Sequence, residues 1–359
     1  MDSLTQVVLG SSVATLTVPA SHRRVALVAG GILGTVPDLD VLWFGLAGSD
    51  AVTQVTWHRG PSHSLLVLTA AGWLLWLWLR WRSALVGESP RRWLWAIWLA
   101  LLTHPLLDAF TVYGTQLLWP LSMPPVMWSS IFIIDPVYTL PLLSGVLLAW
   151  KLSPGRADDG PETGRRSRSA RRWLVIGLSV SSLYLAWSVA AKYRVDRLAE
   201  QSLAAMGLRD APRFSTPLPF NTLSWRVVAM APDGYWIGNR SLIADRGGMR
   251  FTFRPSDTRA LAQLTATPEL RRLLWFTHGF VGVRARHRED GAQRLILSDL
   301  RMGLEPDYFF RYDIAGRDAE GRWIAAPEIT RMSAPDDRMA GLAWAWRRLI
   351  GREAPGMSR

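Results

Sequence analysis

The sequence predicts an α-helical polytopic membrane domain of about five or six helices, followed by a soluble α+β domain. Hydrophobic residues make up 49% of the 359 residues, and 20 of these are Trp. This composition is typical of a membrane protein. The N-terminal half is far more apolar than the C-terminal half, and its long apolar runs alternate with short arginine-rich segments. Two domains of different character are therefore expected.

Six apolar runs are expected to form the helices. Most approach the roughly 20 residues that a hydrocarbon core requires, whereas the first run is short and is expected to be tilted or only partly inserted. No basic residue precedes the first run, and Arg23 and Arg24 follow it. This is the reverse of a cleaved secretory signal, so the segment is expected to be retained. The runs are 4–18, 24–46, 63–79, 93–112, 131–150 and 172–191.

The arginines predict the orientation. Loops rich in Lys and Arg tend to stay in the cytoplasm. Such residues lie after the first, third and fifth runs, whereas 47–62 and 113–130 hold a single basic residue, Arg59. The latter two segments are therefore expected outside. The basic residues of the inner loops are Arg23, Arg24, Arg80, Arg82, Arg91, Arg92, Lys151, Arg156, Arg165, Arg166, Arg168, Arg171 and Arg172.

This alternation divides the chain into four parts. Residues 1–150 are expected to form the transmembrane helical domain and 172–191 a further transmembrane helix. The segment 151–171 between them, rich in Gly, Pro, Ser and charge, is expected to be a flexible cytoplasmic linker. Residues 192–359 are expected to form an extracytoplasmic α+β domain around a modest sheet. Its predicted strands are Trp225–Met230, Met249–Phe253, Arg294–Leu297 and Phe309–Ile314, and its predicted helices lie near 192–206, 257–274 and 336–350.

Charge and cysteine content limit the classes of function. The net charge of +12 comes almost entirely from arginine, since Lys151 and Lys192 are the only lysines. Because much of this excess lies in short loops between apolar runs, it indicates topology, and no nucleic-acid partner is expected. The chain has no cysteine, so any metal must be held by nitrogen and oxygen ligands.

Seven ionisable residues lie in or beside the apolar runs, all on the predicted outer side. An ionisable group at membrane depth costs at least about 2.5 kcal/mol, so such a cluster predicts a functional site. Carboxylates gathered there would repel one another unless a divalent cation neutralised them, and imidazole and carboxylate groups are suitable ligands. The seven are Asp38, Asp40, His58, His63, His104, Asp108 and Asp135.

Spacing suggests how these residues could converge. His104 and Asp108 are four residues apart in LLTHPLLDAF and would share one helix face; a buried hydrogen bond without metal is the alternative. Asp38 and Asp40 diverge by about 200° on a continuous helix, so both can face one site only if the helix breaks. Pro37 and the preceding Gly34 supply a reason for a break.

The remaining candidates lie near helix ends. His58 and His63 flank a turn in which Ser62 is the predicted N-cap of the next helix. Asp135 precedes Pro136 and is either part of the site or a helix cap. Polar residues at the start of the chain could support the site or cap the first helix; they are Asp2, Ser3, Thr5 and Gln6.

The motifs MDSLTQ, GTVPDLD, HRGPSHS, THPLLDAFTVYGTQLLWP and IDPVYTLPLL together resemble the bacterial inner-membrane metal-dependent hydrolase family of the YdjM type. PLPFNTLSWR, LSDLRMG and FRYDIA resemble its longer members, so the resemblance covers nearly the whole chain. It implies a bacterial inner-membrane location and metal-binding roles for six residues, all of which are present: Asp38, Asp40, His58, His63, His104 and Asp108.

The expected function is hydrolysis by a metal-activated water at the outer membrane face. Zinc suits the ligand types best, with manganese or iron as alternatives. Asp38, Asp40 or Asp108 would be the general base if it is not a ligand. The bilayer is the expected partner, and a lipid or lipid-linked phosphoester is the expected substrate.

Two other functions stay open: an ion- or solute-binding transporter, and a non-catalytic membrane-anchored interaction protein. In the C-terminal domain, the aromatic residues Trp225, Tyr235 and Trp236 are expected to be core residues or substrate contacts. His278 and His287 have no partner at ligand spacing and are expected to be structural or exposed.

Overall fold

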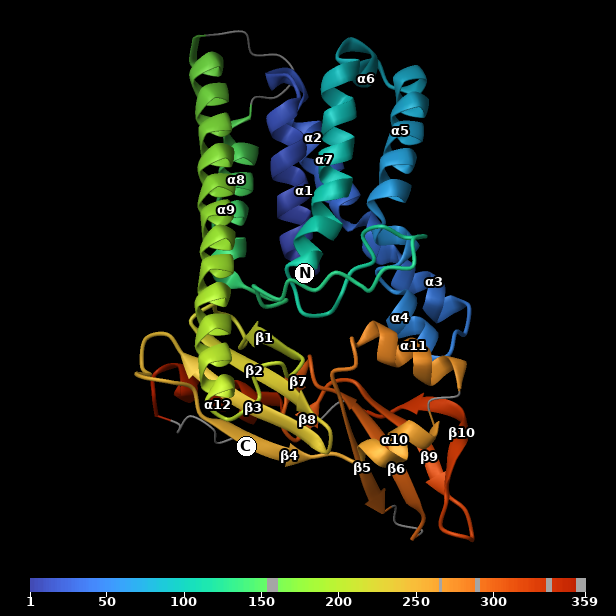
Figure 1. Ribbon diagram of the computed structural model, residues 1–359. Coiled ribbons are helices and arrows are strands. Elements are labelled where there is room, and N and C mark those ends of the chain that lie inside the picture. Colours follow the sequence, from blue (N-terminus) through green and yellow to red (C-terminus); the bar gives the residue numbers. More distant parts are fainter. Residues whose placement is uncertain (154–160, 265–266, 288–290, 334–337, 353–359) are drawn as a thin grey trace. The chain divides into compact units, whose positions relative to one another are not determined.

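The computed structural model describes residues 1–153, 161–264, 267–287, 291–333 and 338–352 (Figure 1). The chain divides into two compact units. The first, called the helical unit, comprises Met1–Trp43, Trp57–Trp128 and Ile133–Ser188. The second, called the mixed unit, comprises Phe44–Thr56, Ser129–Phe132 and Val189–Arg359. An N-terminal helical region and a C-terminal α+β domain were predicted, and both are confirmed.

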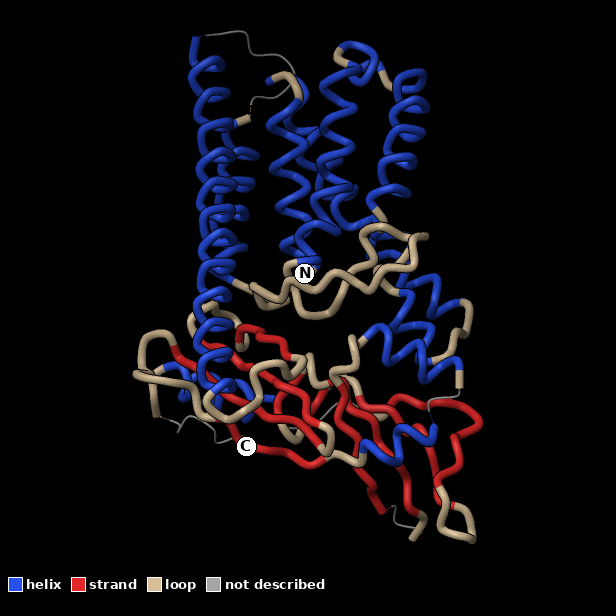
Figure 2. The backbone as a smooth tube through the Cα atoms, in the orientation of Figure 1, coloured by secondary structure: helices blue, strands red, loops and turns tan. Residues whose placement is uncertain are grey.

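Each of the six apolar runs contains a helix (Figure 2). These helices are α1 (Ser3–Thr17), α2 (Arg23–Thr35), α5 (Leu65–Arg82), α7 (Pro90–Ala109), α8 (Pro136–Leu152) and α9 (Pro161–Ala204). Shorter helices connect them: η1 (Ala20–His22), η2 (Val36–Leu39), α3 (Asp40–Leu46), α4 (Ala51–Trp57), η3 (Pro61–His63) and α6 (Ala84–Glu88).

Fewer helices than expected meet a strict criterion for a membrane span. In the described part of the chain, Ala20–Leu46 and Gly164–Ala204 are long and apolar enough to cross a bilayer. A third span results if the bent pair Ala51–His63 and Leu65–Arg82 counts as one. With 15 residues, α1 is shorter than the roughly 20 that a span requires.

Helix α1 packs against α2, α7 and α8 in the helical unit. Glycines permit the closest of these contacts. A Cβ atom on Gly10 would lie 2.3 Å from the carbonyl oxygen of Gly30 and 3.0 Å from the Cα of Gly34. Small residues at such positions allow two helix backbones to approach closely. The position of α2 beside α1 therefore depends on these three glycines.

The predicted break in the second run is present. Helix α2 ends at Thr35, and Val36–Leu39 form the 3-10 segment η2, with Pro37 in its first turn. Asp40 then begins α3. Proline has no backbone N–H to donate to the preceding turn, so the α-helical hydrogen bonding is interrupted. The chain therefore changes direction directly before the two aspartates.

The segment 151–171 differs from the expected flexible linker. Helix α9 begins at Pro161, so the second half of this segment is helical; residues 154–160 lie outside the described residues. Arg and Ser are compatible with a helix, and here they extend the apolar helix that follows.

The mixed unit holds two four-stranded antiparallel sheets and a two-stranded ribbon, in place of the single modest sheet expected. One sheet has the order β1-β2-β3-β4 and the other β10-β9-β6-β5. Its strands are β1 (Arg213–Pro217), β2 (Ser224–Ala231), β3 (Gly234–Ser241), β4 (Phe251–Pro255), β5 (Val281–His287), β6 (Gln293–Asp299), β7 (Gly303–Leu304), β8 (Asp307–Tyr308), β9 (Arg311–Arg317) and β10 (Trp323–Arg331). Its helices, besides the end of α9, are α10 (Thr258–Leu264), α11 (Pro268–Phe276) and α12 (Arg338–Leu349).

Two of the three aromatic residues singled out in the mixed unit belong to its interior, and the third is half-buried. Trp225 and Tyr235 are buried, and Trp236 packs its ring against Phe253. Both exposed histidines, His278 and His287, lie outside any metal-ligand group found in the described chain.

Candidate metal centre

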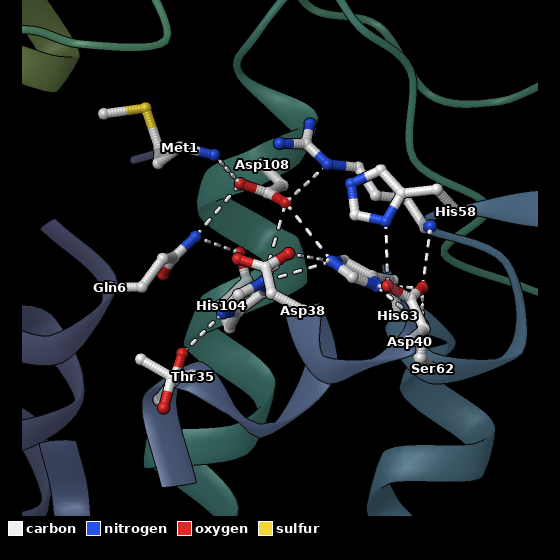
Figure 3. A network of polar contacts seen from close by, with 12 residues as sticks. Met1, Gln6, Thr35, Asp38, Asp40, His58, Ser62, His63, His104 and Asp108 are labelled. Atoms are coloured by element: carbon white, nitrogen blue, oxygen red, sulfur yellow. Dashed lines mark hydrogen bonds and ion pairs between the residues drawn. The ribbon is translucent and has the colours of Figure 1, made fainter. Parts of the chain in front are cut away.

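Four side chains of the helical unit converge at one end of its helices (Figure 3). Asp38 comes from η2, His63 from η3, and His104 and Asp108 from α7. Each offers one ligand atom, and these four atoms all lie within 4.8 Å of one another. We call this group the His/Asp cluster.

Local structure explains how each residue reaches the His/Asp cluster. His104 and Asp108 lie one turn apart on α7, as their spacing predicts. The break at Pro37 directs Asp38 toward His63 and His104. His63 ends η3, directly before Ser64, whose hydroxyl caps α5 by accepting from the Val67 amide. The prediction that Ser62 is this cap was wrong, because its hydroxyl donates to Asp40 instead.

Five of the six distances within the His/Asp cluster are nearly uniform. His63 Nε2 lies 3.1 Å from His104 Nε2. His63 Nε2 is 3.3 Å from Asp38 Oδ1 and 3.4 Å from Asp108 Oδ2. His104 Nε2 is 3.4 Å and 3.6 Å from the same two oxygens. Five of the six edges of this tetrahedron therefore measure 3.1 to 3.6 Å.

Both histidines point their Nε2 atom into the His/Asp cluster, because their Nδ1 atom forms a hydrogen bond outside it. His104 Nδ1 donates to the carbonyl oxygen of Gly34 at 2.6 Å. His63 Nδ1 donates to Ser62 Oγ at 2.9 Å, and Ser62 Oγ donates to Asp40 Oδ2 at 2.6 Å. A neutral imidazole whose Nδ1 carries the proton presents a lone pair at Nε2. The surrounding hydrogen bonds thus select the tautomer that can ligate a metal.

A cation fits the space between these groups. Two imidazole lone pairs and two carboxylate oxygens face one another, and His63, His104 and Asp108 are fully buried. Asp108 Oδ2 completes no hydrogen bond in the described part of the chain. Four zinc ligands about 2.0–2.1 Å from the ion at tetrahedral angles would lie about 3.3 Å apart. The five edges given above match this spacing.

Asp40 and His58 lie beside the His/Asp cluster and pair with each other. Asp40 Oδ1 accepts from His58 Nδ1 at 2.8 Å. The other oxygen of Asp40 lies 4.0 Å from His63 Nδ1, with Ser62 between them. The structure therefore places Asp38, His63, His104 and Asp108 in one group, and Asp40 and His58 next to it, where Asp40 supports His63 through Ser62.

The polar residues at the start of α1 divide into two roles. Asp2 caps this helix by accepting from the Thr5 amide. Gln6 reaches the His/Asp cluster, where its Nε2 donates to Asp108 Oδ1 at 3.0 Å. The α-amino group of Met1 pairs with the same oxygen.

Asp135 is a helix cap. Its carboxylate accepts from the amides of Val137 and Tyr138 at the start of α8 and from the hydroxyl of Tyr184. It is not part of the His/Asp cluster.

Sequence reasoning missed Arg59 as a member of the site. This residue was read only as an isolated positive charge in an outer loop, yet its Nε lies 2.9 Å from Asp108 Oδ2, and both side chains are buried. Its position between His58 and Gly60, inside the motif that supplies two histidines, is a signal that could have identified it.

Comparison with known protein families gives a match over more than half of the chain. The profile of the YdjM inner membrane protein family matches residues 1–195, a range that includes the whole His/Asp cluster and Arg59. No curated protein and no solved structure matches the chain.

Proposed function

This chain belongs to the YdjM inner membrane protein family, and from this premise we propose that it is a membrane-embedded, metal-dependent hydrolase. The single observation that carries the proposal is the tetrahedral spacing of Asp38, His63, His104 and Asp108. Zinc is the proposed metal, because two imidazoles and two carboxylates at this spacing suit it, with manganese or iron as alternatives. A divalent cation held there would polarise an ester oxygen and activate water for attack.

The residues of the site differ in accessibility, and this suggests a division of roles. His63, His104 and Asp108 are fully buried and would hold the metal from the protein side. Asp38 retains 24% of its side-chain exposure. Asp38 is the most exposed of the three carboxylates considered as general base, and we assign it that role; His63, His104 and Asp108 then hold the metal, and the fourth position is left to water. Asp40 and His58, predicted as further ligands, are proposed to orient His63 and to shape the entrance.

The position of the site along its helices supports a lipid-facing function. Arg91 and Arg92 lie at the start of α7, whereas His104 and Asp108 lie near its end, on the order of 20–25 Å away along the axis. Helix α5 likewise carries Arg80 and Arg82 at the end opposite His63. With the arginine-rich end in the cytoplasm, the site would open at the outer membrane face.

A lipid or lipid-linked phosphoester is the proposed substrate class. A site at the end of apolar helices lies near the depth of lipid headgroups, and phosphoester oxygens are suitable partners for a divalent cation. The mixed unit would lie outside the cytoplasm in this orientation.

The test is metal analysis of the detergent-purified full chain, followed by a hydrolysis screen on lipid phosphoesters. The variants are His104→Ala and Asp108→Ala. Thr103→Ala is the matched control, because Thr103 is the neighbour of His104 on α7 and its hydroxyl donates to the carbonyl oxygen of Leu99. Bound metal and hydrolysis should disappear together in the two site variants and persist in the control.

Other outcomes favour the competing functions. Metal that is bound without hydrolysis, together with ion or solute flux that both site variants abolish, would point to a transporter. Unchanged metal content in both variants would refute the metal site and favour an interaction protein.

A further inference from the structure

Arg59 adopts a backbone conformation that is unfavourable for a side chain of its kind. Its φ angle is +62°, in the left-handed region. The backbone is held there from both sides, because the amide donates to Asp40 Oδ2 at 3.2 Å and the carbonyl accepts from the Gln116 amide at 2.9 Å. Strained residues over-determined in this way concentrate at functional sites. The turn thus places the Arg59 side chain at one defined position beside the His/Asp cluster.

A hydrogen bond and a contact with an aromatic ring hold one edge of the Arg59 guanidinium. Its Nη1 donates to Thr111 Oγ1 at 3.2 Å, and its carbon lies 4.9 Å from the centre of the Tyr113 ring. The Nε atom lies near Asp108 Oδ2, but neither atom completes a hydrogen bond, so their contact is one of charge. The Nε–H donor therefore remains available on a guanidinium whose position is already fixed.

The charges change when a divalent cation enters the His/Asp cluster. The two charges of the cation offset those of Asp38 and Asp108, and Arg59 then has no carboxylate of its own in this group. A buried cation without a counter-ion is unfavourable. An anionic ligand beside the metal would supply the missing negative charge.

We propose that Arg59 binds an anionic phosphoryl oxygen of the substrate beside the metal and thereby selects phosphoesters over neutral esters. The proposal rests on the proposed function and assigns to that site a specificity-determining residue. Guanidinium matches the geometry of phosphate with two donors, whereas ammonium acts as a single point charge. Replacement by lysine should therefore keep the charge and lose the recognition.

The experiment uses the full chain in detergent, both metal-loaded and treated with a chelator. Two probes are titrated: inorganic phosphate and a soluble short-chain phosphatidic acid. The variants are Arg59→Lys and Arg59→Gln, and bound metal is measured for each. Arg80→Lys is the matched control. Arg80 also packs over an aromatic ring, that of Trp76, but it lies at the end of α5 that is far from the His/Asp cluster.

Metal-loaded wild type should bind at least one probe. Arg59→Lys should weaken this binding about tenfold or more while bound metal is unchanged, and Arg59→Gln should weaken it further. Arg80→Lys should behave as wild type. Equal loss for both probes would indicate that free phosphate suffices, whereas loss confined to phosphatidic acid would indicate a lipid headgroup.

Several results would overturn the proposal. Wild-type affinity in Arg59→Lys would exclude recognition by Arg59 and leave the metal site intact. Loss of metal in Arg59→Lys would make this residue a structural counter-ion of Asp108. A metal-loaded wild type that binds neither probe would exclude an anionic substrate, whereas a wild type without metal would refute the proposed function itself.

If the Arg59 variants do not fold, Thr111→Val can test the proposal in their place. This variant removes the hydroxyl that positions Nη1 and preserves the arginine. It should weaken probe binding about threefold without loss of metal, and unchanged binding would again contradict the proposal.

Discussion

His63 Nε2 and His104 Nε2 face each other across 3.1 Å, although the two residues lie 41 positions apart in the sequence. Each ring uses its other nitrogen for a hydrogen bond outside the cluster. Two lone pairs at this distance repel unless a cation lies between or beside them. The arrangement is therefore that of two ligands held ready for one metal ion.

Metal removal should lower the stability of the helical unit. A ligand that binds only the folded state at 1,000 times its Kd contributes about 4 kcal/mol. A chelator should therefore lower the melting temperature of the wild type, and zinc should restore it. In His63→Ala the melting temperature should not respond to zinc, as measured by differential scanning fluorimetry in detergent. An equal response to zinc in this variant would exclude His63 as a ligand.

The neighbouring serines Ser62 and Ser64 should have separable roles. Ser62→Ala removes the link between His63 and Asp40 and should weaken metal binding about 10- to 100-fold, the usual effect of losing a partner of a metal-bound histidine. Ser64→Ala removes the cap of α5 and should cost about 1 kcal/mol of stability with metal affinity unchanged. Competition with a chromogenic chelator measures the affinity. Equal affinities in the two variants would contradict the role assigned to Ser62.

The contact between α1 and α2 should tolerate no side chain at Gly10. A Cβ there would lie 2.3 Å from the backbone of Gly30, so Gly10→Val must separate the two helices and disturb the position of Asp38. We expect loss of a monodisperse peak in size-exclusion chromatography. Gly87→Ala is the control, because its Cβ would meet no atom closer than 3.8 Å. A monodisperse Gly10→Val protein would show that this packing is not required.

The mixed unit should lose stability in alkali. Burial, and then the negative charge of Glu305, raise the pKa of Tyr235 above its ordinary value. Above pH about 10 the unfolded chain releases this proton first, so the folded state binds more protons and stability falls as pH rises. Below pH about 10 the contribution is fully present.

Tyr235→Phe should be less stable at neutral pH, because it loses the hydrogen bond to Glu305. Its urea midpoint should also depend less on pH between about 9 and 11. A dependence as steep as that of the wild type would assign the alkaline effect to other groups.

The proposed orientation can be tested with single cysteines, since the chain has none of its own. Met123→Cys, at an exposed position in the loop between α7 and α8, should react with a membrane-impermeant maleimide in intact spheroplasts. Gly87→Cys, at the arginine-rich end of the helices, should react only after permeabilisation. The opposite pattern would place the His/Asp cluster at the cytoplasmic face.

Features encoded by neighbouring residues could be read from the sequence. The six apolar runs predicted helices, Pro37 predicted the break before the aspartates, and the spacing of His104 and Asp108 predicted one helix face. In the mixed unit, strands β1, β3, β5, β7, β8 and β10 were missed, because strand pairing depends on residues far away in the chain.

The sequence predicted the region in which the candidate site lies, but it did not predict which four residues form the His/Asp cluster. By itself, the sequence determined which chemical groups lie at one end of the helices, since helix length and charge pattern are local properties. Only the tertiary structure decided that Asp38 joins His63 and His104, that Asp40 supports His63 through Ser62, and that Arg59 approaches Asp108. The physical reason is that these contacts join separate helices. Their distances are set by how closely α1, α2 and α7 pack, and the spacing of residues along a helix does not contain that information.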